Sequence, residues 1–215
     1  MPNLLHLDSS VDPTNSRSRA ITRTFADAWR QCSPAHTVTY RDLHSAPLPH
    51  FPDPWLHWPA RVRPAEAVVA PDAEALRDSL IAELCAADVV LIGAPMYNYS
   101  LPSTLKAWID YIHIPGITAL YDGNVQPMAG RPAVVVNSRG AMYDVGTPTE
   151  GWDHGTPVLD LILGSSLGMT MRNITANLTL ADFVPMLADF IDRGNDEFAQ
   201  AHAAAAALAV ELGSA

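Results

Sequence analysis

Asp88-Val89-Val90-Leu91-Ile92-Gly93 is the stretch of sequence that decides the fold. Its four consecutive apolar residues show none of the polar and apolar alternation that is typical of a half-exposed strand. Unbroken apolar strands of this kind belong to parallel sheets that helices cover on both faces. We therefore predict that this stretch is a buried central strand of an α/β protein.

The sequence on either side of this strand alternates between strand and helix patterns. Further strands are predicted at residues 3–8, 36–40, 131–138 and 169–176. Helices are predicted from residue 15 or 16, at 72–87, near 105–112, at 157–167, and from Asp182 to the end. Because parallel neighbours need crossover connections, five strands separated by helices predict an open parallel sheet with helices on both faces.

The length and composition favour one domain. The chain has 215 residues, of which 48% are hydrophobic, enough for a single core. Residues 45–71 interrupt the alternation and hold seven of the 18 prolines. Trp55 and Trp58 lie within this segment, so we interpret it as an ordered, proline-rich excursion of a single domain that spans residues 1–215.

The acidic net charge argues against nucleic acid as a partner. The chain carries 13 Lys and Arg against 23 Asp and Glu, a net charge of −10, so a surface that binds nucleic acid by releasing counterions is not expected. The first residues show no secretory signal, and no apolar run approaches the ~20 residues of a membrane span. We predict a cytoplasmic protein with no nucleic-acid or membrane partner.

The spacing of the cysteines and histidines indicates neither a redox-active thiol pair nor a metal site. Cys32 and Cys85 are not spaced as a C-x-x-C motif, and we expect free thiols. The eight histidines form no H-x-x-x-H pair and lack the neighbouring carboxylates of a zinc site. We predict that the protein binds no metal.

Three loops follow the predicted strands at the edge of the sheet where ligands bind in this fold class. The first, residues 8–18, is rich in hydroxyl groups and ends at a helix N-terminus, where free N–H groups and the helix dipole favour an anion. It suits the phosphate of a monoester, and it lacks the glycine patterns of a dinucleotide or nucleoside-triphosphate loop. The alternative is that Ser16 and Ser18 are ordinary helix caps.

The other two loops indicate a flat ligand. Residues 93–108 place two aromatic side chains, an amide and two prolines after a buried strand, a combination that suits a heteroaromatic ring system. Residues 137–143 contain small side chains that let the main chain approach a ligand closely.

Together these loops resemble the FMN-dependent NAD(P)H azoreductases, also described as NAD(P)H:quinone reductases. The resemblance rests on Pro95-Met96-Tyr97-Asn98-Tyr99 with Pro102-Ser103-Thr104-Leu105-Lys106, on Ser138-Arg139-Gly140-Ala141, and on Leu7-Asp8-Ser9-Ser10 with Ser16 and Ser18. It runs from the first strand to about Gly168. It implies a flavodoxin-like fold with strand order 2-1-3-4-5, bound FMN rather than FAD, NADH or NADPH as electron donor, and a homodimer with the flavin near the interface.

The resemblance also implies site residues. Ser10, Ser16, Arg17 and Ser18 would hold the FMN phosphate. The isoalloxazine would be lined by Met96, Tyr97, Asn98, Tyr99, Ser138, Arg139, Gly140 and Ala141. Electrons would pass by a ping-pong mechanism to a quinone, azo or related aromatic acceptor, and no side-chain nucleophile is required because the flavin carries the chemistry.

The predicted substrate pocket contains Tyr121, Tyr143 and Ile162. Ala141 replaces the second glycine of the family pattern, and Val158, Ile162 and Ser165 stand where the family tends to have aromatic residues. Loss of these rings favours a bulkier or less planar acceptor over azo dyes, unless the changed residues only repack the core.

Two other functions remain open from the sequence. A flavodoxin-like electron carrier would bind FMN and a protein partner but no substrate of its own, although it has no use for the 45–71 excursion. Hydrolysis of a phosphodiester is a third possibility, but the sequence offers no paired-carboxylate metal site and no Cys/His nucleophile.

Overall fold

The computed structural model describes residues 1–121, 123 and 126–214, and it is built on a five-stranded sheet. The strands are β1 (Asn3–Asp8), β2 (Thr37–Asp42), β3 (Val89–Pro95), β4 (Pro132–Ser138) and β5 (Thr170–Ala176). Their order is β2-β1-β3-β4-β5, and every neighbouring pair is parallel. The predicted flavodoxin-like fold class and strand order are therefore confirmed.

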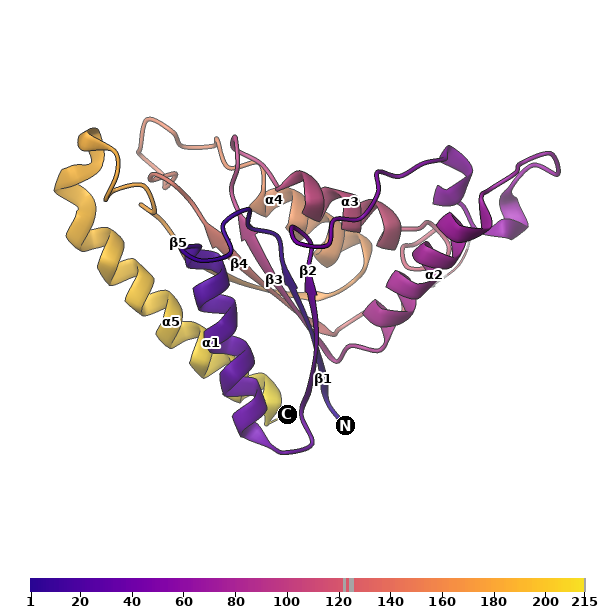
Figure 1. Cartoon of the computed structure of the whole chain (residues 1–215), viewed down its shortest axis with the longest axis horizontal. Helices are drawn as coiled ribbons and strands as arrows, with labels where there is room; N and C mark the ends of the chain where they lie inside the picture. The colour runs from indigo at the N-terminus through magenta and orange to yellow at the C-terminus, as the bar shows by residue number, and fades with distance from the viewer. Residues whose placement is uncertain (122, 124–125, 215) are drawn as a thin grey trace.

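Helices cover both faces of the sheet (Figure 1). One face carries α1 (Arg17–Cys32) and α5 (Ile191–Gly213), which pack on a core with β1, β3, β4 and β5. The other face carries α2 (Pro71–Cys85), α3 (Ser103–Ile112) and α4 (Thr156–Leu159). All three burial patterns of β1, β3 and β4 are almost continuous, which is why their sequences show unbroken apolar runs.

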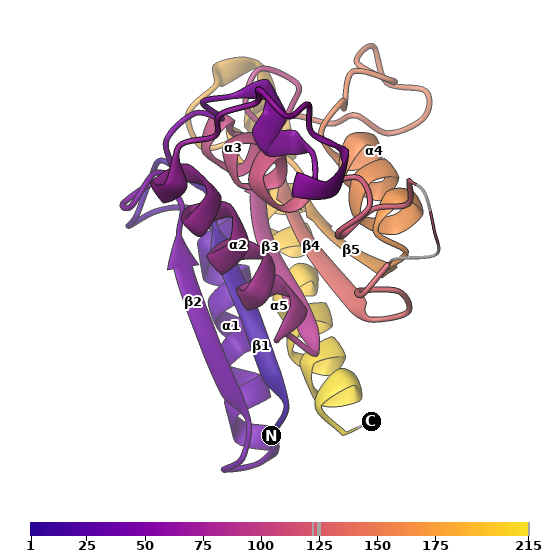
Figure 2. The ribbon, with the colours of Figure 1, turned by 90° about the vertical axis from the view of Figure 1, so that its right-hand side faces the viewer.

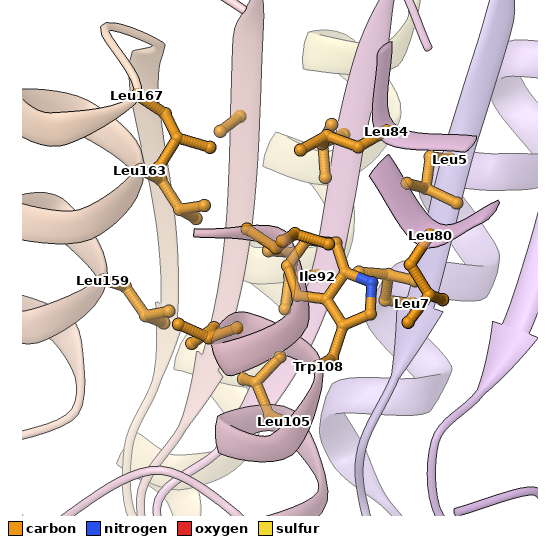
Figure 3. Packing of buried hydrophobic residues seen from close by; sticks show 14 of the residues in the cluster. Leu5, Leu7, Leu80, Leu84, Ile92, Leu105, Trp108, Leu159, Leu163 and Leu167 are labelled. Atoms are coloured by element: carbon orange, nitrogen blue, oxygen red, sulfur yellow. The ribbon is translucent and has the colours of Figure 1, made fainter. Parts of the chain in front are cut away.

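The larger core lies between the sheet and α2, α3 and α4. Figure 3 shows the fully buried Trp108 of α3 beside Leu7, Leu80 and Ile92. These side chains come from α3, β1, α2 and β3, so the indole joins both helices to the centre of the sheet. The apolar area that it removes from water is a large part of what fixes this layer.

The proline-rich segment after β2 is folded against the rest of the molecule. It contains two short 3₁₀ helices, Pro54–His57 and Ala60–Val62, and its Leu56 is fully buried. The Arg77 guanidinium of α2 donates to the Leu56 carbonyl oxygen at 3.1 Å. Figure 2 shows the segment passing over the end of the molecule opposite the chain termini.

The predicted helix from Asp182 onward is wrong in its first turns. Residues 178–184 form turns, Leu178 has a positive φ of 59°, a 3₁₀ helix spans Pro185–Phe190, and α5 begins only at Ile191. Pro185 disfavours α conformation in the residue before it and lacks an N–H for the helical ladder, so the chain cannot continue a helix through this point. The predicted helix at 157–167 is present as α4 followed by a π-helical stretch, Asp160–Ser166.

The remaining predicted boundaries lie within a few residues of those observed.

Among the residues that the structure describes, no helix has both the length and the apolarity needed to cross a membrane.

Candidate functional site

A cavity of about 670 Å³ lies at the carboxyl ends of the strands, next to the point where the strand order reverses between β1 and β3. It is lined by the loop after β1, the ends of β3 and β4, and the segment after β5. The lining residues are Ser10, Asp12, Asn15, Ser16, Arg17, Pro95, Met96, Tyr97, Ser138, Gly140, Thr179, Leu180, Asp182 and Phe183.

The loop after β1 presents a helix N-terminus to this cavity. Ser16 caps α1, and its hydroxyl oxygen accepts a hydrogen bond from the Arg19 N–H at 3.3 Å. Asp12 orders the preceding turn, since one carboxylate oxygen accepts from the N–H groups of Thr14 and Asn15, each at 2.8 Å. These two bonds lower the pKa of the Asp12 carboxyl. The loop thus brings the N-terminus of α1, whose first N–H groups have no partner within the helix, to the cavity wall.

Ser16 and Ser18 differ in their surroundings, although the sequence assigned them the same role. Ser18 is fully buried and does not line the cavity, and its hydroxyl lies 3.0 Å from the Ser16 hydroxyl. Ser16 faces the cavity directly. Ser18 therefore contacts Ser16 rather than the cavity, and its predicted role in holding the phosphate stays a prediction.

The loop after β3 is a tight two-residue hairpin. Tyr97 and Ser100 exchange two backbone hydrogen bonds of 3.0 Å, and the residues between them, Asn98 and Tyr99, have positive φ values of 48° and 68°. Such turns favour asparagine followed by glycine, so a tyrosine at the second position stores backbone strain. Asn98 and Tyr99 stand at the tip of the turn and do not line the cavity, whereas Met96 and Tyr97 do.

Tyr97 joins the two loops. Its phenol oxygen lies 3.1 Å from the Ser10 hydroxyl and accepts a hydrogen bond from the Val11 N–H, also at 3.1 Å. Met96 N–H donates to the Ser138 carbonyl at 2.9 Å, which ties the end of β3 to the end of β4. The three loops that the sequence singled out therefore form one continuous wall.

The end of β4 contributes main chain rather than the Arg139 side chain. Ser138 and Gly140 line the cavity, while Arg139 and Ala141 do not. The Arg139 guanidinium turns away, donating to Asn177 at 2.7 Å and to Asp153 at 3.1 Å. This arrangement makes Arg139 a support for the loop that leads to α4.

Four lining residues after β5 were not predicted: Thr179, Leu180, Asp182 and Phe183. Their segment is bonded to the end of β4, because the N–H groups of Thr179 and Leu180 donate to the carbonyls of Arg139 and Gly140. The sequence carries no motif there. Only the position of the segment could have indicated these lining residues, since it follows a parallel strand at the ligand-binding edge of the sheet.

The only arginine on the cavity wall within the described chain is already paired. Arg17 donates to the Asp182 carboxylate at 3.0 Å and to the Gly194 carbonyl at 3.3 Å, and its guanidinium lies 4.8 Å from the centre of the Phe198 ring. The Arg17 side chain therefore anchors the 178–184 segment. An anion in the cavity would depend mainly on backbone N–H groups and hydroxyls.

None of the three predicted pocket residues lines this cavity. Tyr121 is exposed and lies edge-on to Trp58 with ring centres 5.2 Å apart. Tyr143 lies over the Arg139 guanidinium and 6.5 Å from the Tyr99 ring. Ile162 packs against the larger core. Their predicted role at a substrate pocket stays a prediction.

A partly buried charged cluster lies outside this cavity and lines a second one: Asp8 and Arg19 are buried, Asp42 is half-buried and Tyr40 is exposed. Asp8 accepts hydrogen bonds from the hydroxyls of Thr22 at 2.9 Å and Tyr40 at 3.1 Å. Asp42 accepts two bonds of 2.8 Å from Arg19. Burial alone would raise the pKa of the Asp42 carboxyl, but the bonds from Arg19 and from the backbone of Ser45 outweigh it and hold this pKa well below its usual range. Burial together with the nearby carboxylates raises the pKa of Tyr40 to about 12.

This cluster predicts loss of stability in acid. The pKa of Asp8 is also lowered, because the His6 imidazole, whose Nε2 lies 3.4 Å from an Asp8 oxygen, and the bond from the Thr22 hydroxyl together outweigh its burial. A carboxyl whose pKa is lower in the folded state stabilises the fold fully above its unfolded pKa of about 4, and this contribution is lost as the pH falls through and below that value. We expect urea unfolding to give a small decline in the free energy of unfolding from pH 7 to 5, because burial lowers the pKa values of His57, His113 and His202 below their unfolded value of about 6.5. A steeper decline should follow from pH 5 to 3, where the carboxylates of the cluster are protonated.

The matched control for this prediction is Asp72→Asn, because Asp72 is exposed in the first turn of α2. Its decline with pH should equal that of the unmodified protein, whereas Asp42→Asn should flatten the decline. An identical slope for Asp42→Asn would contradict the assignment.

No group of three or more His, Cys, Asp or Glu side chains is arranged to hold a metal ion anywhere in the described ranges. This finding covers only residues 1–121, 123 and 126–214.

The chain matches known proteins over nearly its whole length. The Flavodoxin_2 family model, described as a flavodoxin-like fold, matches residues 2–208. A protein of Kineococcus radiotolerans named FMN-dependent NADH:quinone oxidoreductase is 57% identical over 212 residues, covering 99% of this chain and 100% of the relative. A protein of Streptomyces coelicolor with the same name is 42% identical, covering 99% of this chain and 96% of the relative.

Solved structures show the same fold at low sequence identity. An azoreductase from Bacillus anthracis superposes with a TM-score of 0.80 at 20% identity, covering 98% of this chain and 100% of the azoreductase. An FMN-dependent NADH-azoreductase from the same species, solved in complex with FMN, gives a TM-score of 0.77 at 19% identity, covering 97% and 100%.

Proposed function

The chain belongs to the Flavodoxin_2 family of flavodoxin-like proteins, and we propose that it is an FMN-dependent oxidoreductase that uses NADH or NADPH to reduce quinones, azo compounds or related aromatic acceptors by two electrons. The proposal is supported by full-length relatives named FMN-dependent NADH:quinone oxidoreductase. The observation that carries it is the single cavity that joins a helix N-terminus, Tyr97 and the main chain at Ser138 and Gly140.

The cavity fits FMN at both ends. Ser10, Ser16 and the first N–H groups of α1 would hold the terminal phosphate, because unpaired donors at a helix N-terminus favour an anion. Met96 and Tyr97 would meet the isoalloxazine, with Ser138 and Gly140 at its polar edge. When bound, FMN supplies the redox chemistry, and the two half-reactions with donor and acceptor would follow in turn, as in a ping-pong mechanism.

The protein's own contribution is position and exclusion of water. The tight turn at Asn98 and Tyr99 fixes Tyr97 against Ser10, and Leu180 and Phe183 add apolar residues to the cavity wall. Asn98, Tyr99, Arg139 and Ala141 do not line the cavity, so we propose that they act by holding the loops that do.

The direct test is a spectrum of the purified protein with FMN and NADH. We expect flavin absorbance to co-purify or to be acquired by added FMN, heat-released flavin to be FMN rather than FAD, and NADH or NADPH to bleach it without any other protein. A flavin reduced only by a partner reductase would favour an electron carrier instead. A protein that bound no flavin would contradict the proposal.

We also propose a homodimer in the cytoplasm with the flavin near the subunit interface. Support comes from large apolar side chains exposed in the loops around the cavity end of the sheet, including Tyr99, Val145 and Trp152. Tyr99 and Trp152 lie edge to face with ring centres 5.3 Å apart, a pre-ordered aromatic patch of the kind enriched at interfaces. Sedimentation velocity of the flavin-loaded protein tests the oligomeric state.

Quinones are expected to be better acceptors than planar azo dyes. Ring surface is absent at Val158 and Ser165, and each lost stacking partner forfeits about 0.5–1.5 kcal/mol for a flat substrate. We expect every quinone of a matched panel to give a higher kcat/KM than every azo dye. An azo dye with the highest kcat/KM of the panel would contradict this expectation.

The variant Ile162→Phe separates a pocket wall from a core position. Because Ile162 packs against the larger core, the added volume should lower the free energy of unfolding by about 1–3 kcal/mol and leave the quinone-to-azo ratio unchanged. A changed ratio would instead place residue 162 at the acceptor.

A further inference from the structure

Arg19 is a buried arginine directly beneath the loop that would hold the FMN phosphate. It lies in the first turn of α1 and is 6% exposed, yet it does not line the cavity. A buried guanidinium needs partners for its charge and its five N–H groups, so the partners it has indicate what it does.

The guanidinium of Arg19 bridges two parts of the chain. It donates two bonds of 2.8 Å to the two carboxylate oxygens of Asp42, at the end of the edge strand β2. It also donates to the Ser10 carbonyl oxygen at 2.7 Å, which is among the shortest contacts of the loop. The planar fork of an arginine holds both acceptors in fixed relative positions, which a lysine ammonium does not.

Asp42 is itself held firmly. Its carboxylate accepts hydrogen bonds from the His44 N–H at 3.0 Å, from the Ser45 N–H at 3.1 Å and from the Ser45 hydroxyl at 2.9 Å. The bridge therefore runs from a fixed point at the end of β2 to the main chain of Ser10.

Arg19 also contacts the second hydroxyl of the phosphate loop through its main chain. Its N–H donates to the Ser16 hydroxyl oxygen at 3.3 Å. Ser10 and Ser16, the two serines of this loop that face the cavity, are thus both bonded to the same residue from outside. The Ser10 hydroxyl is approached from its other side by the Tyr97 phenol.

We propose that Arg19 is a positioning residue for phosphate recognition, which fixes Ser10 and Ser16 at the separation that the FMN phosphate requires. The inference rests on the proposed function as an FMN enzyme. Arg19 acts by fixing the positions of the serines rather than by attracting the phosphate. Asp42 neutralises the charge of its guanidinium, and a carboxylate oxygen of Asp8 also lies 3.8 Å from that guanidinium. The cluster offers no net positive charge to a phosphate.

The test compares the dissociation constants of FMN and riboflavin, which differ only in the phosphate. Arg19→Met should reduce the preference for FMN at least tenfold, while the affinity for riboflavin changes less than about twofold. Fluorescence titration of the flavin-free protein measures both constants, and circular dichroism checks the fold. A variant that merely loosened the fold would weaken both flavins together and leave their ratio unchanged.

The matched control is Arg77→Met. Arg77 is also buried and paired with carboxylates, Asp78 at 2.7 Å and Glu74 at 3.0 Å, and it also donates to a backbone carbonyl, but it lies in α2 far from the loop in sequence and does not line the cavity. Its loss should lower stability and keep the flavin preference of the unmodified protein.

Two further variants keep the inference testable if Arg19→Met does not fold. Asp42→Asn leaves Arg19 in place but weakens its anchor, and it should reduce the FMN preference by a smaller factor than Arg19→Met. Arg19→Lys keeps the charge without the fork, and it should also lose preference.

Full retention of the FMN preference by Arg19→Lys, or equal weakening of both flavins by Arg19→Met, would overturn the inference. Failure of the proposed function looks different, because the unmodified protein would then bind neither flavin.

Discussion

Ser16→Asp is expected to weaken FMN binding at least a hundredfold while leaving the flavin-free protein as stable as before, or slightly more stable. Aspartate is as good an N-cap as serine, and a negative charge at a helix N-terminus interacts favourably with the dipole. The variant therefore keeps the capping bond to the Arg19 N–H. It also puts a carboxylate where the proposal places a phosphate.

The magnitude follows from two losses. A hydrogen bond from the Ser16 hydroxyl to a charged phosphate contributes about 1.5–3 kcal/mol. Two like charges about 4 Å apart near a protein surface repel by about 4 kcal/mol, and the phosphate approaches a dianion. Since 1.4 kcal/mol corresponds to tenfold in affinity, a hundredfold loss is the lower bound.

The opposite responses of stability and binding make this variant informative. Thermal unfolding of the flavin-free protein and titration with FMN measure the two quantities separately. Ser103→Asp is the matched control, because Ser103 is the exposed first residue of α3 and lies outside the cavity. It adds the same charge to another helix N-terminus and should leave FMN affinity within twofold. If Ser16→Asp bound FMN as tightly as the unmodified protein, the proposed position of the phosphate at this loop would be wrong.

The sequence predicted the sheet because its strands are buried on both faces. β3 and β4 are covered by helices on each side, so apolar residues run without interruption and can be recognised without any partner strand. The prediction of a helix from Asp182 missed the turns before Pro185, which depend on tertiary bonds from the N–H groups of Thr179 and Leu180 to the carbonyls of Arg139 and Gly140. Pro185 itself was a local signal against an α-helix through this point.

Part of the candidate site was also predictable, because the positions of the strands place several loops at one edge of the sheet. Seven of the residues assigned to the cofactor line one cavity because they lie at strand ends that meet or at the start of the helix that follows β1: Ser10, Ser16, Arg17, Met96, Tyr97, Ser138 and Gly140. Ser18 lies two residues beyond Ser16, and its hydroxyl is 3.0 Å from the Ser16 hydroxyl, but Ser18 is fully buried and does not line the cavity.

Other features of the site required the folded chain. Arg17 and Arg19 read alike in the sequence, yet one pairs with Asp182 and the other with Asp42. These carboxylates lie 165 and 23 residues away along the chain. Spacing along a single helix cannot reveal such partners.

Gly93→Ala is expected to destabilise the protein by about 2–6 kcal/mol, although it adds a single methyl group. A Cβ at Gly93 would stand 2.5 Å from a carboxylate oxygen of Asp8 and 3.3 Å from the Thr22 methyl. That oxygen accepts the Thr22 hydroxyl bond and belongs to a carboxylate that is 4% exposed. Overpacking costs about 1–3 kcal/mol, and displacing a buried charged acceptor adds a similar amount.

The effect of Gly93→Ala should reach the site as well as the fold, because the Gly93 carbonyl accepts the Ser9 hydroxyl at 2.7 Å and so fixes the start of the phosphate loop. Urea unfolding measures the loss. Gly123→Ala is the control, since among the described atoms none lies within 4 Å of an added Cβ there, and it should change stability by less than about 0.5 kcal/mol. A double-mutant cycle with Asp8→Ala, which removes the crowded carboxylate, tests whether the clash with Asp8 causes the loss of stability. In that background Gly93→Ala should cost much less, because the added methyl group then meets only the Thr22 methyl, at 3.3 Å. An undiminished cost would mean that the clash with Asp8 is not what makes this glycine necessary.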